Sequence, residues 1–103
     1  MELLTEELRR SLPALYFQEG NPDPVVHIKF FTPDSSWTWY VTEGSAEGDA
    51  ILFFGYVIGF EREWGYFHLS EITESLGPMG LAIERDLYFK PVSFSRVVPP
   101  AER

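Results

Sequence analysis

Along the middle of the chain, apolar and polar residues alternate with a period of two, which is typical of β-strands. The pattern predicts four strands, over residues 25–31, 37–42, 51–60 and 64–69. A proline-containing turn and a glycine-rich acidic loop connect the first three of them. Because short connections join neighbouring antiparallel strands, the sequence predicts a four-stranded antiparallel meander.

Two short helices are expected beside this sheet. Leucines at every fourth position from 4 to 12 form one apolar stripe, and Thr5 is a suitable N-cap. We therefore predict a helix over residues 5–12. A second helix is predicted over residues 70–76, with Ser70 as its N-cap.

The last residues, 91–103, are interrupted by prolines and are predicted to form an extended C-terminal arm. A chain of 103 residues has the size of one domain. The sequence thus predicts a single α+β domain over residues 1–103. Its two helices would pack on one face of the antiparallel sheet.

The faces of the sheet follow from the register, because residues paired across strands share a face. Matching apolar positions places Ile28 and Phe54 on either side of Trp39, and Ile58 beside Phe67. The predicted core face contains Val26, Ile28, Phe30, Trp37, Trp39, Val41, Leu52, Phe54, Tyr56, Ile58, Phe67 and Leu69. The opposite, mixed face contains His27, Lys29, Phe31, Thr38, Tyr40, Thr42, Phe53, Gly55, Val57, Gly59, Tyr66 and His68.

The mixed face carries the candidate interaction surface, a groove over the glycines of the third strand. A glycine in a central strand often marks the close approach of another group. Either the C-terminal segment with Leu87, Phe89 and Phe94 packs into this groove, or the groove is an exposed apolar patch that binds a partner. The residues predicted to line it are Tyr40, Phe53, Gly55, Val57, Tyr66 and His68.

The formal charge of the chain is −8, and it originates in the middle of the sequence. Nine acids but only one base lie between Phe30 and Glu84. Direct binding to nucleic acid is therefore disfavoured, since affinity for phosphates depends on the cations that a protein supplies. The simplest interpretation is a solvated acidic surface that keeps a small protein in solution.

The absence of cysteine excludes disulfides and thiolate metal sites, and it is compatible with a reducing compartment. The N-terminus is acidic and amphipathic, unlike a signal peptide. The longest apolar run, Ile51–Phe60, has about half the length that spans a bilayer. We expect a cytoplasmic protein that does not contact a membrane.

No motif for catalysis or metal binding stands out. His27 and His68 are the only histidines, and in a meander they lie about 14 Å apart, too far to share one zinc ion. Asp34-Ser35-Ser36 offers a hydroxyl nucleophile but no neighbouring histidine base. We therefore expect no metal, no cofactor and no catalytic residue, and we favour a function without catalysis.

The stretch Glu84-Arg85-Asp86 places a guanidinium between two carboxylates. In an extended backbone, Arg85 points away from both acids. Two interpretations remain open for these residues. Arg85 bonds backbone carbonyls or another acid as a structural residue, or the three residues contact a partner.

Five segments of the chain are similar to one known family: Lys29–Asp34, Trp37–Tyr40, Phe53–Gly55, Gly65–Phe67 and Ile83–Phe89. The Trp-Thr-Trp-Tyr and Ile-Glu-Arg-Asp stretches are the most specific of them. On these residues, nearly the whole chain resembles the bacterial family known as domain of unknown function 2958. The resemblance implies a small bacterial protein that is often associated with plasmids and other mobile elements. It implies no activity, cofactor or catalytic residue.

Three classes of function remain open. A non-enzymatic accessory domain that binds another protein, in a bacterial mobile element, is favoured because aromatic residues are abundant on one polar-rimmed face. The alternative is an acidic decoy that occupies a DNA-binding protein, although DNA carries charge far more densely than this chain. A small enzyme is the third. An exposed apolar patch would favour the first class, a continuous acidic stripe the second and a deep polar cleft the third.

Overall fold

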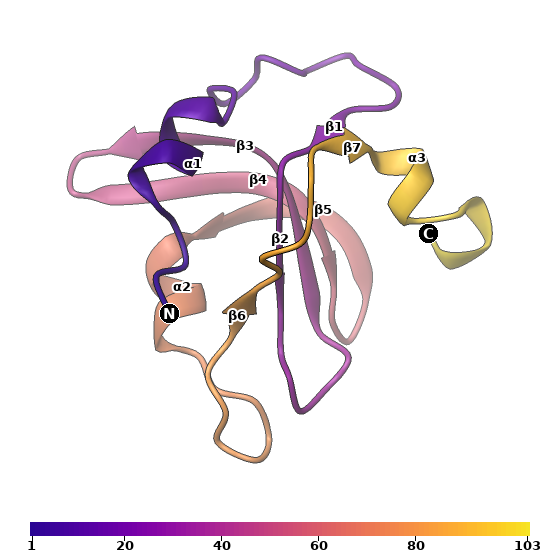
Figure 1. Ribbon diagram of the computed structural model, residues 1–103. Helices are drawn as coiled ribbons and strands as arrows, with labels where there is room; N and C mark the ends of the chain where they lie inside the picture. Colours follow the sequence, from indigo (N-terminus) through magenta and orange to yellow (C-terminus); the bar gives the residue numbers. More distant parts are fainter.

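The computed structural model describes residues 1–103, and it contains two antiparallel sheets with short helices around them (Figure 1). The strands are β1 (Val25–Val26), β2 (Ile28–Phe31), β3 (Thr38–Glu47), β4 (Ala50–Ile58), β5 (Arg62–His68), β6 (Glu84–Arg85) and β7 (Val92–Ser93). The helices are α1 (Glu6–Ser11), α2 (Leu69–Glu74), α3 (Phe94–Val97) and the 3-10 helix η1 (Pro100–Glu102). None of these helices has the length and apolar character needed to cross a membrane.

The large sheet has the strand order β5-β4-β3-β2-β6, so β2 to β5 form the predicted meander. The prediction of an α+β fold is confirmed, but the sheet has five strands rather than four. The fifth strand, β6, pairs with β2 at the edge. β6 is not predicted by the sequence pattern, because it is only two residues long and residues 83–89 do not alternate.

The predicted first strand is divided at His27. Residues before this break form β1, which pairs with β7 in a separate two-stranded sheet. The backbone N–H of His27 donates to the carbonyl of Val41 at 2.8 Å, so the chain stays beside β3 across the break. Val26 thereby turns away from the face that carries Ile28.

One face of the large sheet carries the main core, and α1 and α2 cover it (Figure 1, left). Thr5 caps α1 as predicted, since its hydroxyl oxygen accepts a hydrogen bond from the Leu8 N–H at 3.1 Å. α2 begins one residue before the predicted helix, with His68 as its N-cap. The buried residues of the main core are Leu12, Ile28, Phe30, Trp39, Val41, Phe53, Phe67, Ile72 and Ile83.

The opposite face carries a second, smaller core under the C-terminal segment (Figure 1, right). Phe94 of α3 packs edge-on against Tyr56, with ring centroids 5.0 Å apart. Asp23 holds α3 in place, because its carboxylate accepts hydrogen bonds from the Ser95 N–H at 2.9 Å and from the Ser95 hydroxyl at 2.7 Å. Residues 91–103 are therefore not an extended arm, since they form β7, α3 and η1 and contribute Phe94 and Val98 to the second core.

The register of β4 differs from the prediction. Trp39 pairs with Val57 rather than with Phe54. Phe53 consequently packs in the main core, while Tyr56 packs in the second core. Because apolar residues cover both faces of β4, their alternation could not distinguish the two registers.

Two other predicted residue pairs are also wrong. Ile28 pairs with Val41 instead of Trp39, which shifts β2 by two residues and leaves its faces unchanged. Phe67 pairs with Phe53 rather than with Ile58. The predicted loop over residues 44–49 is also mostly strand, because β3 continues to Glu47.

A β-bulge at Thr42 reverses the faces of β3. Val41 pairs with Gly55, but the next pair is Glu43 with Phe54, so β3 has one extra residue. Glu43 thereby lies on the same face as Phe54, away from the main core. Gly55 is required at this point, since a Cβ there would overlap the carbonyl oxygen of Tyr40.

The two glycines that face each other across β4 and β5 give a matched test of this close approach. Gly55→Ala should lower the free energy of unfolding by about 1–3 kcal/mol, because the backbone of β3 must move away from the added methyl group. Gly65→Ala should change it by less than about 1 kcal/mol, since no atom lies within 4 Å of a Cβ at Gly65. Chemical denaturation of both variants measures the difference. Equal stabilities would contradict the bulge geometry.

Candidate functional site

The residues predicted to line one groove lie on both faces of the sheet. Three of them face the main core: Phe53, Gly55 and Val57. The other three lie on the opposite face or at its end: Tyr40, Tyr66 and His68. Of these, Tyr40 is buried under the C-terminal segment, and only Tyr66 presents a largely exposed aromatic ring, at 52%.

No open groove lies over Gly55 of β4 or over Gly59, which follows β4. The backbone of β3 occupies the space beside Gly55, and the Trp37 ring occupies the space beside Gly59. One of the two interpretations placed the C-terminal segment in this groove, but that segment packs elsewhere, on the face with Tyr40. Phe89 lies 6.4 Å from Tyr40 between ring centroids, and Phe94 is buried in the second core.

The Glu84-Arg85-Asp86 stretch ties the N-terminus to the sheet. One guanidinium nitrogen of Arg85 donates to the carbonyls of Glu2 at 2.7 Å and Leu3 at 3.0 Å. Asp86 forms an ion pair with Lys29 at 3.9 Å. Arg85 therefore bonds backbone carbonyls, as in the structural one of its two interpretations. Glu84 is exposed at the sheet edge.

The two histidines have different surroundings. His27 lies in a hollow between α1 and the chain after β6, where burial lowers its pKa. His68 lies 3.5 Å from Glu47, measured between Nε2 and a carboxylate oxygen. No group of three His, Cys, Asp or Glu residues is arranged to hold a metal ion.

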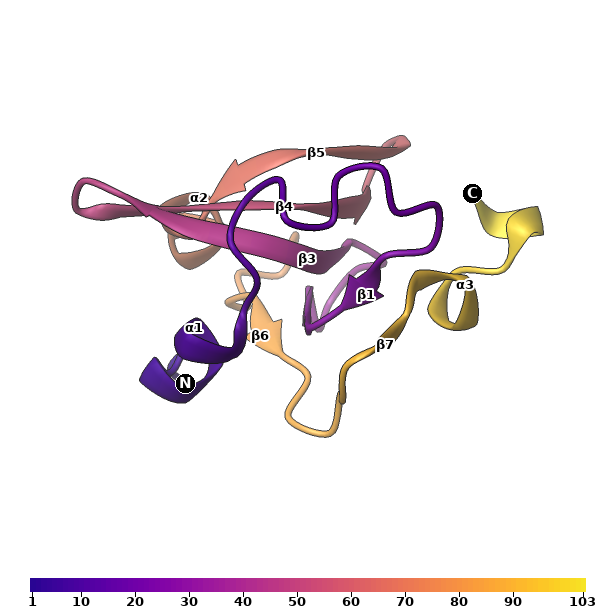
Figure 2. The same ribbon diagram turned by 90° about the horizontal axis from the view of Figure 1, so that it is seen from above.

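The strongest candidate site lies where the loop between α1 and β1 crosses β3 (Figure 2). Beyond the bulge, β3 extends past the end of β2, which leaves one of its edges without a neighbouring strand. The loop covers this edge with hydrogen bonds. The Gly44 N–H donates to the carbonyl of Pro13 at 2.9 Å, and the Leu15 N–H donates to the hydroxyl of Ser45 at 2.9 Å.

Glu43 anchors this loop. Its side chain is buried, with 4% of the residue exposed, and no ion pair compensates its carboxylate. One carboxylate oxygen accepts from the Tyr16 N–H at 3.1 Å, and the other accepts from the Gln18 N–H at 2.5 Å. Hydrogen bonds to a charged acceptor are strong, and they offset the cost of burying this group.

Gln18 joins the loop to two strands. Its amide nitrogen donates to the carbonyls of Val25 and Thr42, both at 3.0 Å. Its amide oxygen accepts from the Val25 N–H at 2.7 Å. The side chain thus bridges β1 and β3, and it holds the loop in one position relative to both.

Tyr16 has a strained backbone. Its φ of +73° lies in the left-handed region, which a bulky residue rarely adopts. The conformation directs the Tyr16 N–H to Glu43, yet the residue remains 61% exposed. Strain that is not compensated by burial in a core is common at binding sites.

Four aromatic side chains form a row: Trp64 and Tyr66 from β5, Phe54 from β4 and Tyr16 from the loop. Phe54 stacks on Trp64 with ring centroids 5.8 Å apart, and Tyr66 lies 4.9 Å from Phe54. Tyr16 continues the row at 6.5 Å from Tyr66. We call these four residues the aromatic row. It continues the second core beyond the C-terminal segment, since Trp64 also contacts Phe94 at 4.7 Å.

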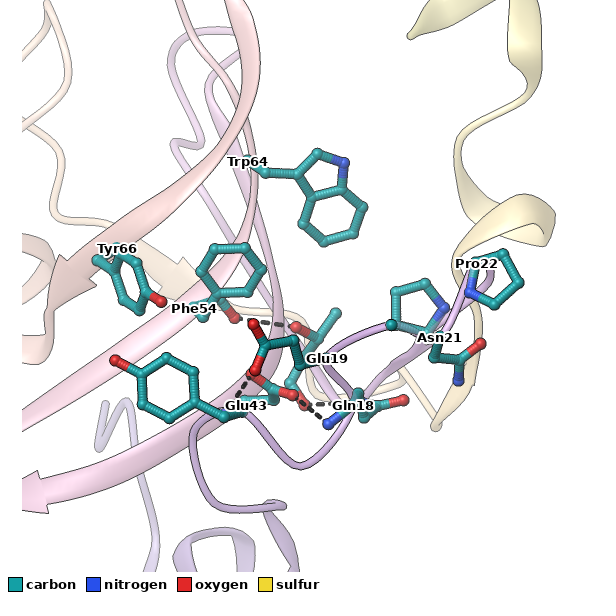
Figure 3. Close-up of a pocket in the computed structure, with 12 residues that line it drawn as sticks. Gln18, Glu19, Asn21, Pro22, Glu43, Phe54, Trp64 and Tyr66 are labelled. Carbon is teal, nitrogen blue, oxygen red and sulfur yellow. Dashed lines mark hydrogen bonds between the residues drawn. The ribbon is translucent and has the colours of Figure 1, made fainter.

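The aromatic row and the loop enclose a cavity of about 310 Å³, which we call the acidic cup (Figure 3). Figure 3 shows Trp64, Phe54 and Tyr66 on the sheet side, and Asn21 and Pro22 across from them on the loop. Two acids, Glu19 and Glu43, line the cup, and no lysine or arginine does. The full lining is Tyr16, Gln18, Glu19, Gly20, Asn21, Pro22, Pro24, Thr42, Glu43, Phe54, Trp64 and Tyr66.

Ionisation of the Tyr66 phenol is disfavoured at the wall of the cup. Hydrogen bonding with the Tyr16 side chain raises the pKa of Tyr66 most, desolvation raises it further, and the charges of Glu19 and Glu43 add the smallest contributions. A phenol beside carboxylates is harder to ionise because its anion would be repelled. Because two carboxylates and no lysine or arginine line the cup, it favours cations over anions.

Of the residues that line the cup, only Tyr66 was predicted to belong to an interaction surface. Phe54 was placed on the wrong face, and Glu43 was counted only among surface acids. Two signals were available: adjacent aromatic residues, Tyr16 and Phe17, stand in a loop, and a lone carboxylate follows the apolar half of β3. Neither signal indicates that the two segments meet.

Comparison with known proteins identifies a family but no function. A family model described as "Protein of unknown function (DUF2958)" matches residues 3–100. Neither a curated protein nor a solved structure shows a significant match to the chain.

The contact between the two tyrosines gives a test of the cup in solution. Tyr16→Phe removes the hydroxyl beside Tyr66, so the pKa of Tyr66 should fall toward its ordinary value near 10. The pH titration of the Tyr66 phenol carbon, followed by NMR, measures this change. Tyr88→Phe is the control, because Tyr88 is 93% exposed and lies outside the cup. An unchanged Tyr66 pKa in Tyr16→Phe would show that the two rings do not meet.

Proposed function

The chain belongs to the DUF2958 family, and we propose that it is a non-enzymatic domain that binds another protein through the aromatic row. The observation that carries this proposal is the partial exposure of the row. Trp64 is 38% exposed and Tyr66 is 52% exposed, although both are large apolar side chains in a regular strand. Tyrosine and tryptophan are enriched at protein interfaces and often supply much of the binding energy.

The neighbouring sheet edge supports the same proposal. β5 is the outermost strand, and its outer edge has no strand beside it. Such an edge offers unpaired N–H and C=O groups to an extended segment of a partner. The aromatic row lies directly beside this edge, so one partner can use both.

The distribution of acids gives less support to the alternative function as a decoy for a DNA-binding protein. Glu47 and Asp49 lie at one end of the large sheet, and Glu61 and Glu63 lie at the other, roughly 30 Å away along β4. Glu43, between them, is buried. A decoy would benefit from a continuous acidic stripe, and the aromatic row interrupts this one.

A catalytic function has the least support, because the cup contains neither a histidine nor a hydroxyl activated by one. We further propose that the domain acts in the cytoplasm, as an accessory protein of a bacterial mobile element. This part of the proposal rests on the family resemblance and on the acidic, cysteine-free composition.

Site-specific crosslinking tests the proposed surface. A photo-reactive phenylalanine analogue at position 66 should crosslink one protein in the cells that produce the chain, because the Tyr66 ring would lie in the interface. The same analogue at position 88, where Tyr88 is even more exposed but lies outside the row, should not crosslink that protein. Adding Tyr16→Ala should abolish the product at position 66. Identical products from both positions would exclude the aromatic row as the binding surface.

A further inference from the structure

We propose that the acidic cup binds a cationic side chain of the partner, specifically an arginine guanidinium. This inference rests on the proposed function, since it names the group that the aromatic row and its acids recognise. Three properties of the cup carry it: uncompensated negative charge, aromatic faces and a rigid frame.

The charge of the cup has no counterpart within the chain. Glu43 and Glu19 contribute two carboxylates, and no cation is among the lining residues. Each oxygen of Glu43 accepts only one hydrogen bond, while a carboxylate has about four acceptor positions. Acceptor capacity therefore remains for donors that enter the cup.

Two arginines that contact the C-terminal segment have other partners. Arg103 lies over the ring of Phe94 at 5.0 Å and donates to the carbonyl of Val98 at 2.9 Å. Arg62 donates to the carbonyl of Glu102 at 2.5 Å. The contact of Arg103 with Phe94 shows that a guanidinium already stacks at the C-terminal end of the same series of rings. The other end of the series, in the cup, is open.

The aromatic faces favour a cation over a neutral group. A guanidinium within about 6 Å of an aromatic ring is attracted to the negative face of the ring, most strongly where water is excluded. Trp64, Phe54 and Tyr66 provide three adjacent rings on one wall, and the carboxylates lie beside them (Figure 3). A planar guanidinium can stack on a ring and donate to carboxylates in its own plane, whereas an ammonium cannot stack in this way.

The frame of the cup is fixed in advance. Glu43 and Gln18 together hold the loop through five hydrogen bonds. Tyr16, which forms part of the wall, has a left-handed backbone conformation. Groups held in place before binding lose little entropy when a ligand enters. The cup therefore has the character of a binding site rather than of a gap between loosely packed segments.

A pair of isosteric peptides tests the inference. The probes are acetyl-Gly-Gly-Arg-Gly-Gly-amide and the same peptide with citrulline, which has the shape of arginine without its charge. Titrations followed by NMR should shift the Trp64 indole N–H and the amides of residues 16–19. The citrulline peptide should bind about tenfold more weakly. A lysine peptide should fall between the two, and added salt should weaken arginine binding.

Two charge-neutralising variants localise the effect. Glu19→Gln should weaken arginine binding severalfold without changing stability, because Glu19 is an exposed acid at the rim of the cup. Glu61→Gln removes an exposed acid outside the cup and should leave binding unchanged. Glu43→Gln is unsuitable as the sole test, since Glu43 also anchors the loop.

Three outcomes would overturn the inference: equal affinity for the arginine and citrulline peptides, shifts confined to residues outside the cup, or no shifts at millimolar peptide. The crosslinking result separates this failure from failure of the proposed function. A partner that crosslinks at position 66 while the arginine peptide does not bind would retain the aromatic row as an interface and reject the cation. Loss of both would reject the two proposals together.

Discussion

The candidate site depends on one extra residue in a central strand. Without the bulge at Thr42, the Glu43 side chain would continue the alternation of Val41 and point into the main core, where an unpaired carboxylate is costly. The bulge places it on the opposite face, beneath the loop between α1 and β1. Its two oxygens then receive the N–H groups of Tyr16 and Gln18. Gly55 permits the close approach of strands on which this geometry depends.

The large sheet uses its two faces differently. Helices α1 and α2 pack over the main core, and the C-terminal segment covers part of the other face. The uncovered part retains an aromatic row that is continuous with the second core through Trp64 and Phe94. Burial at one end thus fixes the rings that are exposed at the other end. This arrangement supplies a rigid surface at little cost in stability.

Much of the fold follows from local patterns, but the site does not. Short connections and alternation predicted the meander, and a leucine stripe with Thr5 predicted α1. The register of β4 could not be predicted, because apolar residues occupy both of its faces. The bulge has no local signature, since Thr42 and Glu43 are compatible with regular strand. The cup joins residue 16 to residues 43 and 66, and such long-range contacts are decided by packing rather than by sequence pattern.

The central claim is that the Glu43 carboxylate holds the loop that forms the cup. Amide hydrogen exchange in Glu43→Gln tests it most directly, because glutamine keeps the size of the side chain and has only one acceptor oxygen. The amides of Tyr16 and Gln18 should exchange at least about tenfold faster than in the wild type, while those of β4 keep their protection. Glu47→Gln, at the exposed end of β3, should leave both sets unchanged. Unaltered protection of Tyr16 and Gln18 in Glu43→Gln would contradict this account.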